Sequence, residues 1–543
     1  MRRALLKALI LALPLAACVK NPPLLKPTEV QAPEIPTVAA APDPMTLGWV
    51  RAHQLVRLAE RLGVENPTAM ASAAGVDLAP IDPERPFVLL FGEPTGTETP
   101  GALAWAPVAP DSGIAMILAG ASPSGTIPMA GGVAIPLLGA TGADTKTKLL
   151  LEKLINAPIA MDLEIFVQLH ALVKNWGPQI EAGLVSMQGA LKNLPGPGPK
   201  PQPAVIDTYL GWARDALARA GTVLIGFAAG ADDVTLQYVS QDKTAMSTAW
   251  PARASSMPDL AQFLPTGAVR LELVMTQDTK MMEFALKLYD ELLKDLPAQR
   301  DRLRRDLEAW QKGEVQMAMS MSFGGDRLFR AAGLSQTDQA EALFASMVDM
   351  AHLVAEPEVG HALTQDMISL NVKVEEGVRE IEGRSVARVT YTLGFGPKMK
   401  EEAKSPALVA MLDKPMVMEM VRLGSYLLYT LNEAPGTLDT LAAELLGGKG
   451  SQPSLLSRSR EPAGGYFYMD TDLAGLMNGV ISLLPAEPLQ SVPQVDPKTP
   501  LVTAFAYGPG PLNFVRMTLP QVALQNLRRF GEQLGASRHA ARN

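Results

Sequence analysis

The sequence predicts an α+β protein with two lobes of antiparallel sheet and packed helices. Three observations support this class. The chain has 543 residues, which is enough for at least two domains. Its residues are 47% apolar and 19% charged, a composition typical of globular rather than disordered proteins. Strand-like apolar runs joined by Gly- and Pro-bearing turns are mixed along the chain with amphipathic helical stretches.

The first lobe is expected over residues 46–255. The predicted helices cover residues 46–62, 146–155, 161–191 and 204–220. The third of these should be interrupted at Gly177-Pro178, because proline breaks a helix interior. The predicted strands cover residues 87–91, 102–108 and 113–119, followed by a hairpin of 223–228 with 234–240.

The second lobe is expected over residues 256–543. A charged helix over 279–310 should break at Pro297. Further helices are predicted at 438–446, directly after 469, and at 522–534. The predicted strands cover residues 269–275, 315–322, 367–374, 386–393, 416–423 with a continuation to 428, and 466–469, followed by a hairpin of 501–507 with 513–519.

The two lobes share a short sequence echo. Phe227-Ala228-Ala229-Gly230 closes a predicted strand near the end of the first lobe, and Phe505-Ala506-Tyr507-Gly508 closes one near the end of the second. Another predicted strand follows each of them. The echo favours a duplicated lobe, although a Phe and a Gly at this spacing also recur by chance.

The N-terminus has the pattern of an export signal. Arg2, Arg3 and Lys7 precede an apolar run over 8–15 that is too short to cross a bilayer as a helix. The run ends in Leu15-Ala16-Ala17-Cys18, which resembles the lipobox of bacterial prolipoproteins. The resemblance implies that residues 1–17 are a signal peptide removed by cleavage. It further implies that the Cys18 thiol carries a diacylglyceryl group, usually with acylation of the new amino terminus.

The segment after Cys18 indicates a tether and a destination. Residues 19–44 contain seven Pro in 26 positions, so residues 18–45 form a lipidated Cys and an extended Pro-rich tether. Val19 stands where the family's inner-membrane proteins carry Asp. The resemblance therefore implies a protein anchored in the outer membrane, facing the periplasm or the cell surface. An ordinary cleaved signal peptide and an uncleaved anchor are the alternatives.

Several function classes are excluded by composition. A net charge of −8 argues against a nucleic-acid partner. A single Cys excludes an intramolecular disulfide and a multi-thiolate zinc site. No catalytic motif or cofactor signature is found, so no catalytic residue, metal or cofactor is expected. His352 is interpreted as an isolated residue, and Glu376 as part of a solvated acidic rim near Gly377.

Two further segments of the body, Ile81-Asp82-Pro83-Glu84-Arg85-Pro86 and Gly464-Gly465-Tyr466-Phe467-Tyr468-Met469-Asp470, are similar to an uncharacterised family of exported bacterial proteins. That family has no known activity, so the resemblance implies nothing about chemistry.

Methionine is the compositional feature with functional content, at 26 residues. Two trios alternate along predicted strands: Met317, Met319, Met321 and Met416, Met418, Met420. Period two places each trio on one face of a sheet. Flexible, polarizable thioethers suit a ligand-binding face for apolar molecules of varied shape. A buried sheet core and a Cu(I) site are the alternatives.

These observations favour a non-enzymatic binding or assembly protein of the cell envelope, joined to the membrane by its lipid and engaging an apolar ligand or an envelope protein. An envelope hydrolase with a site assembled from distant residues is the alternative. A purely structural subunit of a surface complex is a third reading.

The lipobox gives the first testable prediction. Protein purified from membranes should begin at Cys18 and carry the mass of two or three acyl chains, which together anchor a protein stably. Cys18→Ser should lack that mass and leave the membrane fraction. Intact-mass spectrometry and membrane fractionation check both. Wild-type protein without acyl mass would overturn the lipoprotein assignment.

Overall fold

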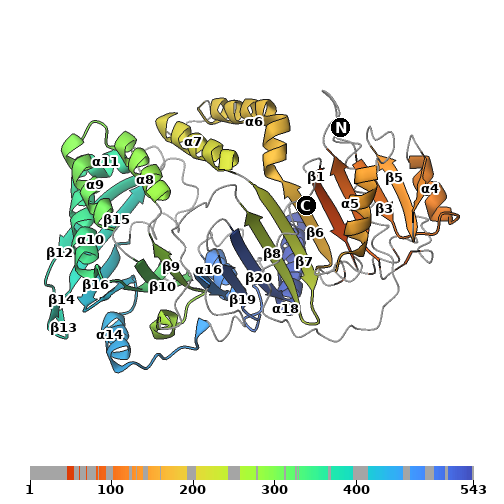
Figure 1. Ribbon diagram of the computed structural model, residues 1–543. Helices are drawn as coiled ribbons and strands as arrows, with labels where there is room; N and C mark the ends of the chain where they lie inside the picture. The colour runs from red at the N-terminus through yellow and green to blue at the C-terminus, as the bar shows by residue number, and fades with distance from the viewer. Residues whose placement is uncertain are drawn as a thin grey trace. The chain divides into compact units, whose positions relative to one another are not determined.

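A computed structural model (Figure 1) describes residues 46–540, with gaps at 54–59, 61–65, 67–68, 70–80, 83–84, 93–101, 122–124, 130, 138–144, 159–160, 193–202, 220, 242–256, 277–278, 311–313, 325–326, 328, 365–367, 396–413, 456–464, 483–493 and 508–511. The expected signal peptide, Cys18 and the tether lie outside the described residues. Among the helices that are described, none is both long enough and apolar enough to cross a bilayer.

The chain divides into two compact units. Unit 1 comprises Met1–Pro178, Leu217–Lys243 and Phe514–Gln525. Unit 2 comprises Gln179–Ala216, Thr244–Asn513 and Asn526–Asn543. Both contain antiparallel strands with packed helices, so the predicted α+β class is confirmed. The helices α6 (Leu169–Lys192), α7 (Pro203–Arg219) and α18 (Gln521–Ala540) belong partly to each unit.

The strands of unit 1 form an antiparallel sheet in the order β4-β5-β3-β2-β1-β6-β7-β8, and β20 pairs with β8. Helix α5 packs on one face with the buried Trp105 and Leu90, and α4 packs on the other with Val133 and Ile135. The elements are β1 (Thr46–Ala52), β2 (Phe87–Gly92), β3 (Ala102–Ala106), α4 (Gly113–Ala121), β4 (Ile127–Met129), β5 (Gly132–Leu137), α5 (Thr145–Asn156), β6 (Leu163–Gln168), β7 (Thr222–Ala229), β8 (Asp233–Gln241) and β20 (Leu512–Pro520).

A buried ion pair fixes the centre of this sheet. Arg51 on β1 and Glu164 on β6 are direct cross-strand neighbours, each 5% exposed, and Arg51 Nε donates to Glu164 Oε2 at 2.5 Å. The remaining guanidinium nitrogens donate to the carbonyls of Leu154, in the last turn of α5, and of Ala157 and Pro158, just after it. Burial raises the pKa of Glu164, and the Arg51 charge offsets this only in part. The cost of burying the two charges therefore offsets much of their attraction, and the fixed hydrogen-bond geometry keeps the pair in place.

The strands of unit 2 form a second antiparallel set in the order β19-β18-β9-β10-β11-β17-β16-β15-β12. The short hairpin β13 (Glu380–Ile381) with β14 (Arg384–Ser385) is separate. The strands are β9 (Val269–Thr276), β10 (Glu314–Phe323), β11 (Phe329–Gln336), β12 (Ile368–Glu375), β15 (Ala387–Phe395), β16 (Met416–Leu423), β17 (Tyr426–Leu431), β18 (Phe467–Thr471) and β19 (Val502–Tyr507).

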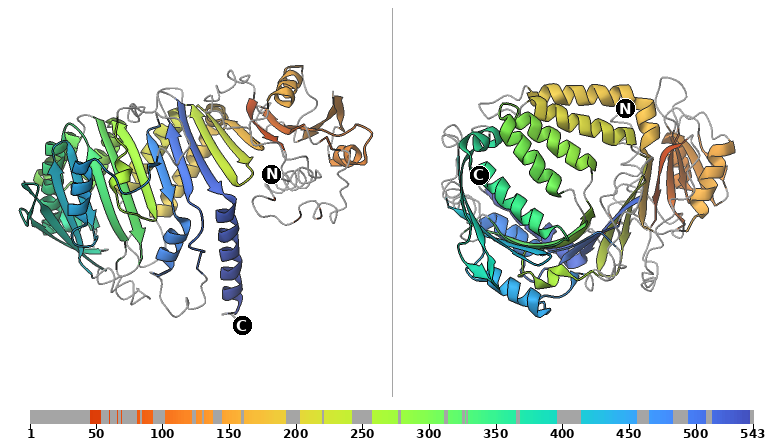
Figure 2. Two further views of the ribbon diagram at one scale, coloured as in Figure 1. Left: turned by 90° about the horizontal axis from the view of Figure 1, so that it is seen from below. Right: turned by 60° about the vertical axis from the view of Figure 1, so that its left-hand side comes forward.

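Helices cover the two faces of unit 2 unequally. The helices are η1 (Leu260–Phe263), α8 (Thr279–Leu292), α9 (Pro297–Trp310), α10 (Ala340–Ala355), α11 (Pro357–Thr364), α14 (Thr437–Gly447) and α16 (Leu473–Ser482). Helix α10 packs directly on β12, β16 and β17, and leucines join it to α8, α9 and α11 in a second layer. Helix α14 packs on β16 and β17 from the opposite face (Figure 2, right).

A second buried ion pair lies on the α14 face. Arg270 on β9 is the cross-strand neighbour of Asp470 on β18, and its Nη2 lies 3.2 Å from Asp470 Oδ2. The same nitrogen donates to the Pro453 carbonyl in the chain between α14 and β18. As in unit 1, an arginine joins two neighbouring strands to the segment that follows a helix.

Two predicted elements are wrong in type. Residues Thr46–Ala52 form β1 rather than a helix, because β2 and β6 pair with them on both sides. Residues Gly113–Ala121 form α4 rather than a strand. The Ser112 side chain accepts a hydrogen bond from the Ala115 N–H at 3.2 Å, which caps the first turn of that helix.

Two predicted boundaries are also corrected. The helix expected from residue 161 starts at Leu169, because Leu163–Gln168 pairs with β1 and β7 as β6. Its interruption is confirmed at Trp176, where φ −121° and ψ 16° leave the helical region just before Gly177-Pro178. The strand expected to run to residue 428 reverses at Gly424, whose φ of 62° allows a tight turn.

The buried ion pair of unit 1 gives a stability prediction. Glu164→Leu should destabilise the protein by about 3–5 kcal/mol, because it leaves the Arg51 guanidinium buried without its partner. Arg51→Met combined with Glu164→Leu should recover most of that loss. Denaturant unfolding measures both changes. As the control, Arg214→Ala breaks an exposed pair with Glu181 and should leave the midpoint unchanged. A double variant no more stable than Glu164→Leu would contradict the account.

Candidate functional site

The register of unit 2 brings both methionine trios to the same face. Direct neighbours across an antiparallel pair share a face. Met319 lies opposite Leu271 and Gly333, and Gly333 lies opposite Tyr429, which lies opposite Met420. One row across the strands consists of Ala504, Met469, Leu271, Met319, Gly333, Tyr429, Met420 and Ala387. The next row carries Met321 and Met418 in the same way. We call this side the apolar face.

Helix α10 covers one end of the apolar face. Met420 has no exposed surface, and the half-buried Met418 packs in the same cluster, with Val348 and Ala351 of α10. The Tyr429 ring lies over Gly333, so closely that a Cβ on Gly333 would be 2.0 Å from the ring. Burial raises the pKa of Tyr429 to about 12. This end of the face is a packed core.

The other end of the apolar face is half-buried. Met317, Met319 and Met321 on β10 are all partly accessible, as are their neighbours Leu271 and Leu273 on β9. Phe467 and Met469 on β18 extend the same surface. The two trios, alike in sequence, therefore differ in environment. The trio on β10 offers flexible thioethers on a half-buried apolar surface, and such side chains can adapt to ligands of varied shape.

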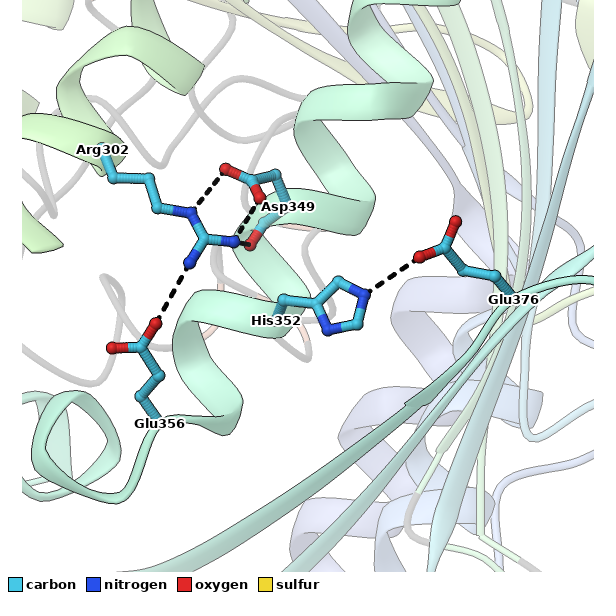
Figure 3. Close-up of polar contacts among 5 residues, drawn as sticks. All are labelled: Arg302, Asp349, His352, Glu356 and Glu376. Atoms are coloured by element: carbon cyan, nitrogen blue, oxygen red, sulfur yellow. Dashed lines mark hydrogen bonds and ion pairs between the residues drawn. The ribbon is translucent and has the colours of Figure 1, made fainter.

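A polar cluster lies in the helix layer above the covered end (Figure 3). Arg302 on α9 reaches two carboxylates. Its Nε donates to Asp349 Oδ2 on α10 at 2.7 Å, and its Nη2 donates to Asp349 Oδ1. Its Nη1 donates to Glu356 Oε1, at the start of α11, at 3.0 Å. We call Arg302, Asp306, Asp349 and Glu356 the Arg302 cluster.

The cluster contains two carboxyl groups with opposite pKa shifts. Burial and the adjacent Asp349 carboxylate raise the pKa of Asp306 from 3.8 to about 6. The hydrogen bonds from Arg302 outweigh burial and hold the pKa of Asp349 below its ordinary value. Asp306 and Asp349 therefore share a proton near pH 6, with the charge favoured on Asp349.

On the other side of α10, His352 Nε2 lies 3.1 Å from Glu376 Oε1, in the connection between β12 and β13 (Figure 3). Sequence reasoning missed this contact and the Arg302 cluster, because their members are far apart in the chain. The seven-residue spacing of Asp349 and Glu356, the two carboxylates that Arg302 joins, was the only local signal.

A separate cavity of about 380 Å³ lies between η1 and α14, lined by residues that include Phe263, Pro265, Thr437 and Glu444. Its single carboxylate, Glu444, accepts the Ser451 N–H at 3.3 Å. It offers no pair of titratable groups for hydrolysis. Within the described part of the chain, no group of three or more His, Cys, Asp or Glu residues is placed to hold a metal ion.

Comparisons with known proteins add no relative: no family model, no curated protein and no solved structure matches this chain.

The Arg302 cluster predicts how stability depends on pH. Asp306 has a raised pKa in the folded protein, so its stabilising contribution is complete below about pH 4 and is lost as the pH rises through about 6. Asp306→Asn keeps the group neutral and should remove this part of the loss. Melting temperatures from pH 5 to 7.5 test the difference. The control is Asp301→Asn on the same helix, which should keep the wild-type profile. Parallel profiles for wild type and Asp306→Asn would contradict the assignment.

Proposed function

We propose that this chain is a lipid-anchored protein of the cell envelope that binds an apolar ligand on the apolar face of unit 2. One observation supports the binding role: three half-buried methionines lie beside the half-buried Leu271, Leu273 and Met469 on one face of the sheet. An acyl chain or a similar flexible apolar molecule fits such a surface, because thioethers adapt to shape at little cost. The role is binding rather than catalysis.

The proposed location is inferred from the N-terminal sequence. Cleavage before Cys18 and lipidation of its thiol would join the protein to the outer membrane, and the Pro-rich residues 19–44 would hold the body away from it. At about 3.1 Å per residue an extended tether of this length spans on the order of 80 Å. A protein placed there meets lipids and envelope proteins, which are the partners that the proposal names.

We further propose that the body is two lobes related by duplication. The strand order β4-β5-β3-β2-β1-β6-β7 of unit 1 has a counterpart in β16-β17-β11-β10-β9-β18-β19 of unit 2. The matched strands also follow one another in the same order along the chain. The segment from α10 to β15 would then be an insertion in the second copy.

Two details support the duplication. The sequence echo of Phe227 and Phe505 falls on the matched strands β7 and β19. In each unit one helix precedes the sixth matched strand, α5 in unit 1 and α14 in unit 2. Each of these helices lies on the face of its sheet that carries the buried arginine–carboxylate pair. The two arginine–carboxylate pairs lie at opposite ends of the matched strands, so they do not occupy equivalent positions. The duplication is therefore inferred from the shared strand order. A crystal structure with α5 and α14 on opposite faces of the matched strands would refute it.

The hydrolase alternative has weaker support. It needs paired titratable groups that converge on a cleft. The pair Asp306 and Asp349 has separated pKa values, but Arg302 occupies the Asp349 carboxylate and Ser346 Oγ donates to the Asp306 backbone carbonyl. Both groups serve the contact between α9 and α10, which favours the binding role.

Binding of the fluorescent probe N-phenylnaphthylamine tests the proposed site. Met319→Glu should weaken binding at least about tenfold, because a carboxylate in the middle of the apolar rows must lose its hydration when the probe binds. Met319→Leu keeps the volume and should bind within about threefold of wild type. Met116→Glu, on a side chain of α4 that is 67% exposed, is the matched control and should have no effect. Equal binding by Met319→Glu and wild type, or no binding by wild type, would refute the site.

A further inference from the structure

Helix α10 connects the apolar face to the titratable groups of unit 2. Towards the strands, its Val348 and Ala351 pack against Met420 and Val372. Towards the helix layer, its Asp349 meets Arg302 of α9, and Leu353 packs with leucines of α8 and α9. The covered end of the apolar face is therefore accessible only if α10 moves away from the strands.

Contacts on both sides of α10 respond to protons in the same direction. On the α9 side, Asp306 and Asp349 attract each other when they share a proton and repel when both are ionised. On the strand side, the contact of His352 with Glu376 becomes an ion pair only when the imidazole is protonated. Acidification strengthens both contacts at once.

The fixed charges around these groups do not reverse that direction. From α9, Arg302 and Arg305 face the carboxyl pair and stay positive throughout. At the α10–α11 corner, Glu356 is bound by Arg302 Nη1 and by Gln299 Nε2. Among the contacts described on these two sides of α10, those of Asp306 with Asp349 and of His352 with Glu376 therefore change with protonation.

We propose that α10 is a proton-controlled cover of the apolar face, which closes over Met418 and Met420 when these contacts take up protons and loosens when they release them. The proposal rests on the function proposed above, since it regulates access to the same face. An apolar ligand seated on Met317, Met319 and Met321 extends under α10 at neutral pH and is excluded from there at acidic pH.

An uncharged fluorescent C16 monoacylglycerol tests the cover, because its own charge does not change with pH. Wild-type protein should bind it about fourfold more tightly at pH 7.5 than at pH 5.5, which is the linkage expected if Asp306 titrates near 6 when the cover is closed and near 3.8 when it is open. Asp306→Asn should bind more weakly than wild type at pH 7.5 and should keep only the smaller pH dependence that comes from His352. His352→Gln should reduce the pH dependence, and Asp301→Asn should preserve it.

Hydrogen exchange separates failure of the cover from failure of the binding site. After correction for intrinsic rates, residues 340–355 of α10 should exchange faster at pH 7.5 than at pH 5.5 in wild type, and this difference should be smaller in Asp306→Asn. The helix α14 is the internal control and should not change. If the probe binds equally at both pH values and α10 exchange does not change, the cover is refuted. If α10 responds but the probe never binds, the cover stands and the proposed ligand site is refuted.

Discussion

The organisation of unit 2 depends on the register of β10 between β9 and β11. Side chains alternate along a strand, so this register sends Gln316, Ala318 and Ser320 to one face and the three methionines to the other. A slip by one residue would turn Met319 towards Arg270 and Glu272. The pairing of Arg270 with Asp470 opposes such a slip between β9 and β18, since it would separate two buried charges. A charged contact on one face thus secures an apolar surface on the other.

Three arginines act in two ways, according to how deeply they are buried. Arg51 and Arg270 are almost fully buried and join neighbouring strands to a backbone segment. Arg302 is partly exposed and joins three elements of the helix layer through two carboxylates. The buried pairs hold a fixed geometry, whereas the Arg302 cluster remains open to exchange of protons with the solvent.

Local patterns predict much of this fold and little of the site. The strand-like apolar runs correctly predicted β10, β12 and β15. The pattern failed at β1, whose state is set by strands paired on both sides. It also could not place the two methionine trios on one face, because that placement is a product of strand order. The contact of Arg302 with Asp349 is likewise a product of helix packing, because the partners are 47 positions apart in the sequence.

The half-buried thioethers of β10 give the apolar face a chemical sensitivity that the covered end lacks. Methionine sulfoxide is polar and chiral, and it forms most readily where the sulfur is accessible to oxidants. Oxidation of Met317, Met319 or Met321 would place a dipole in the middle of the apolar rows, while Met420, which has no exposed surface, would be spared. If the protein is exported as we propose, beyond the reducing systems of the cytosol, the oxidation state of these three sulfurs would decide how much of the surface remains apolar.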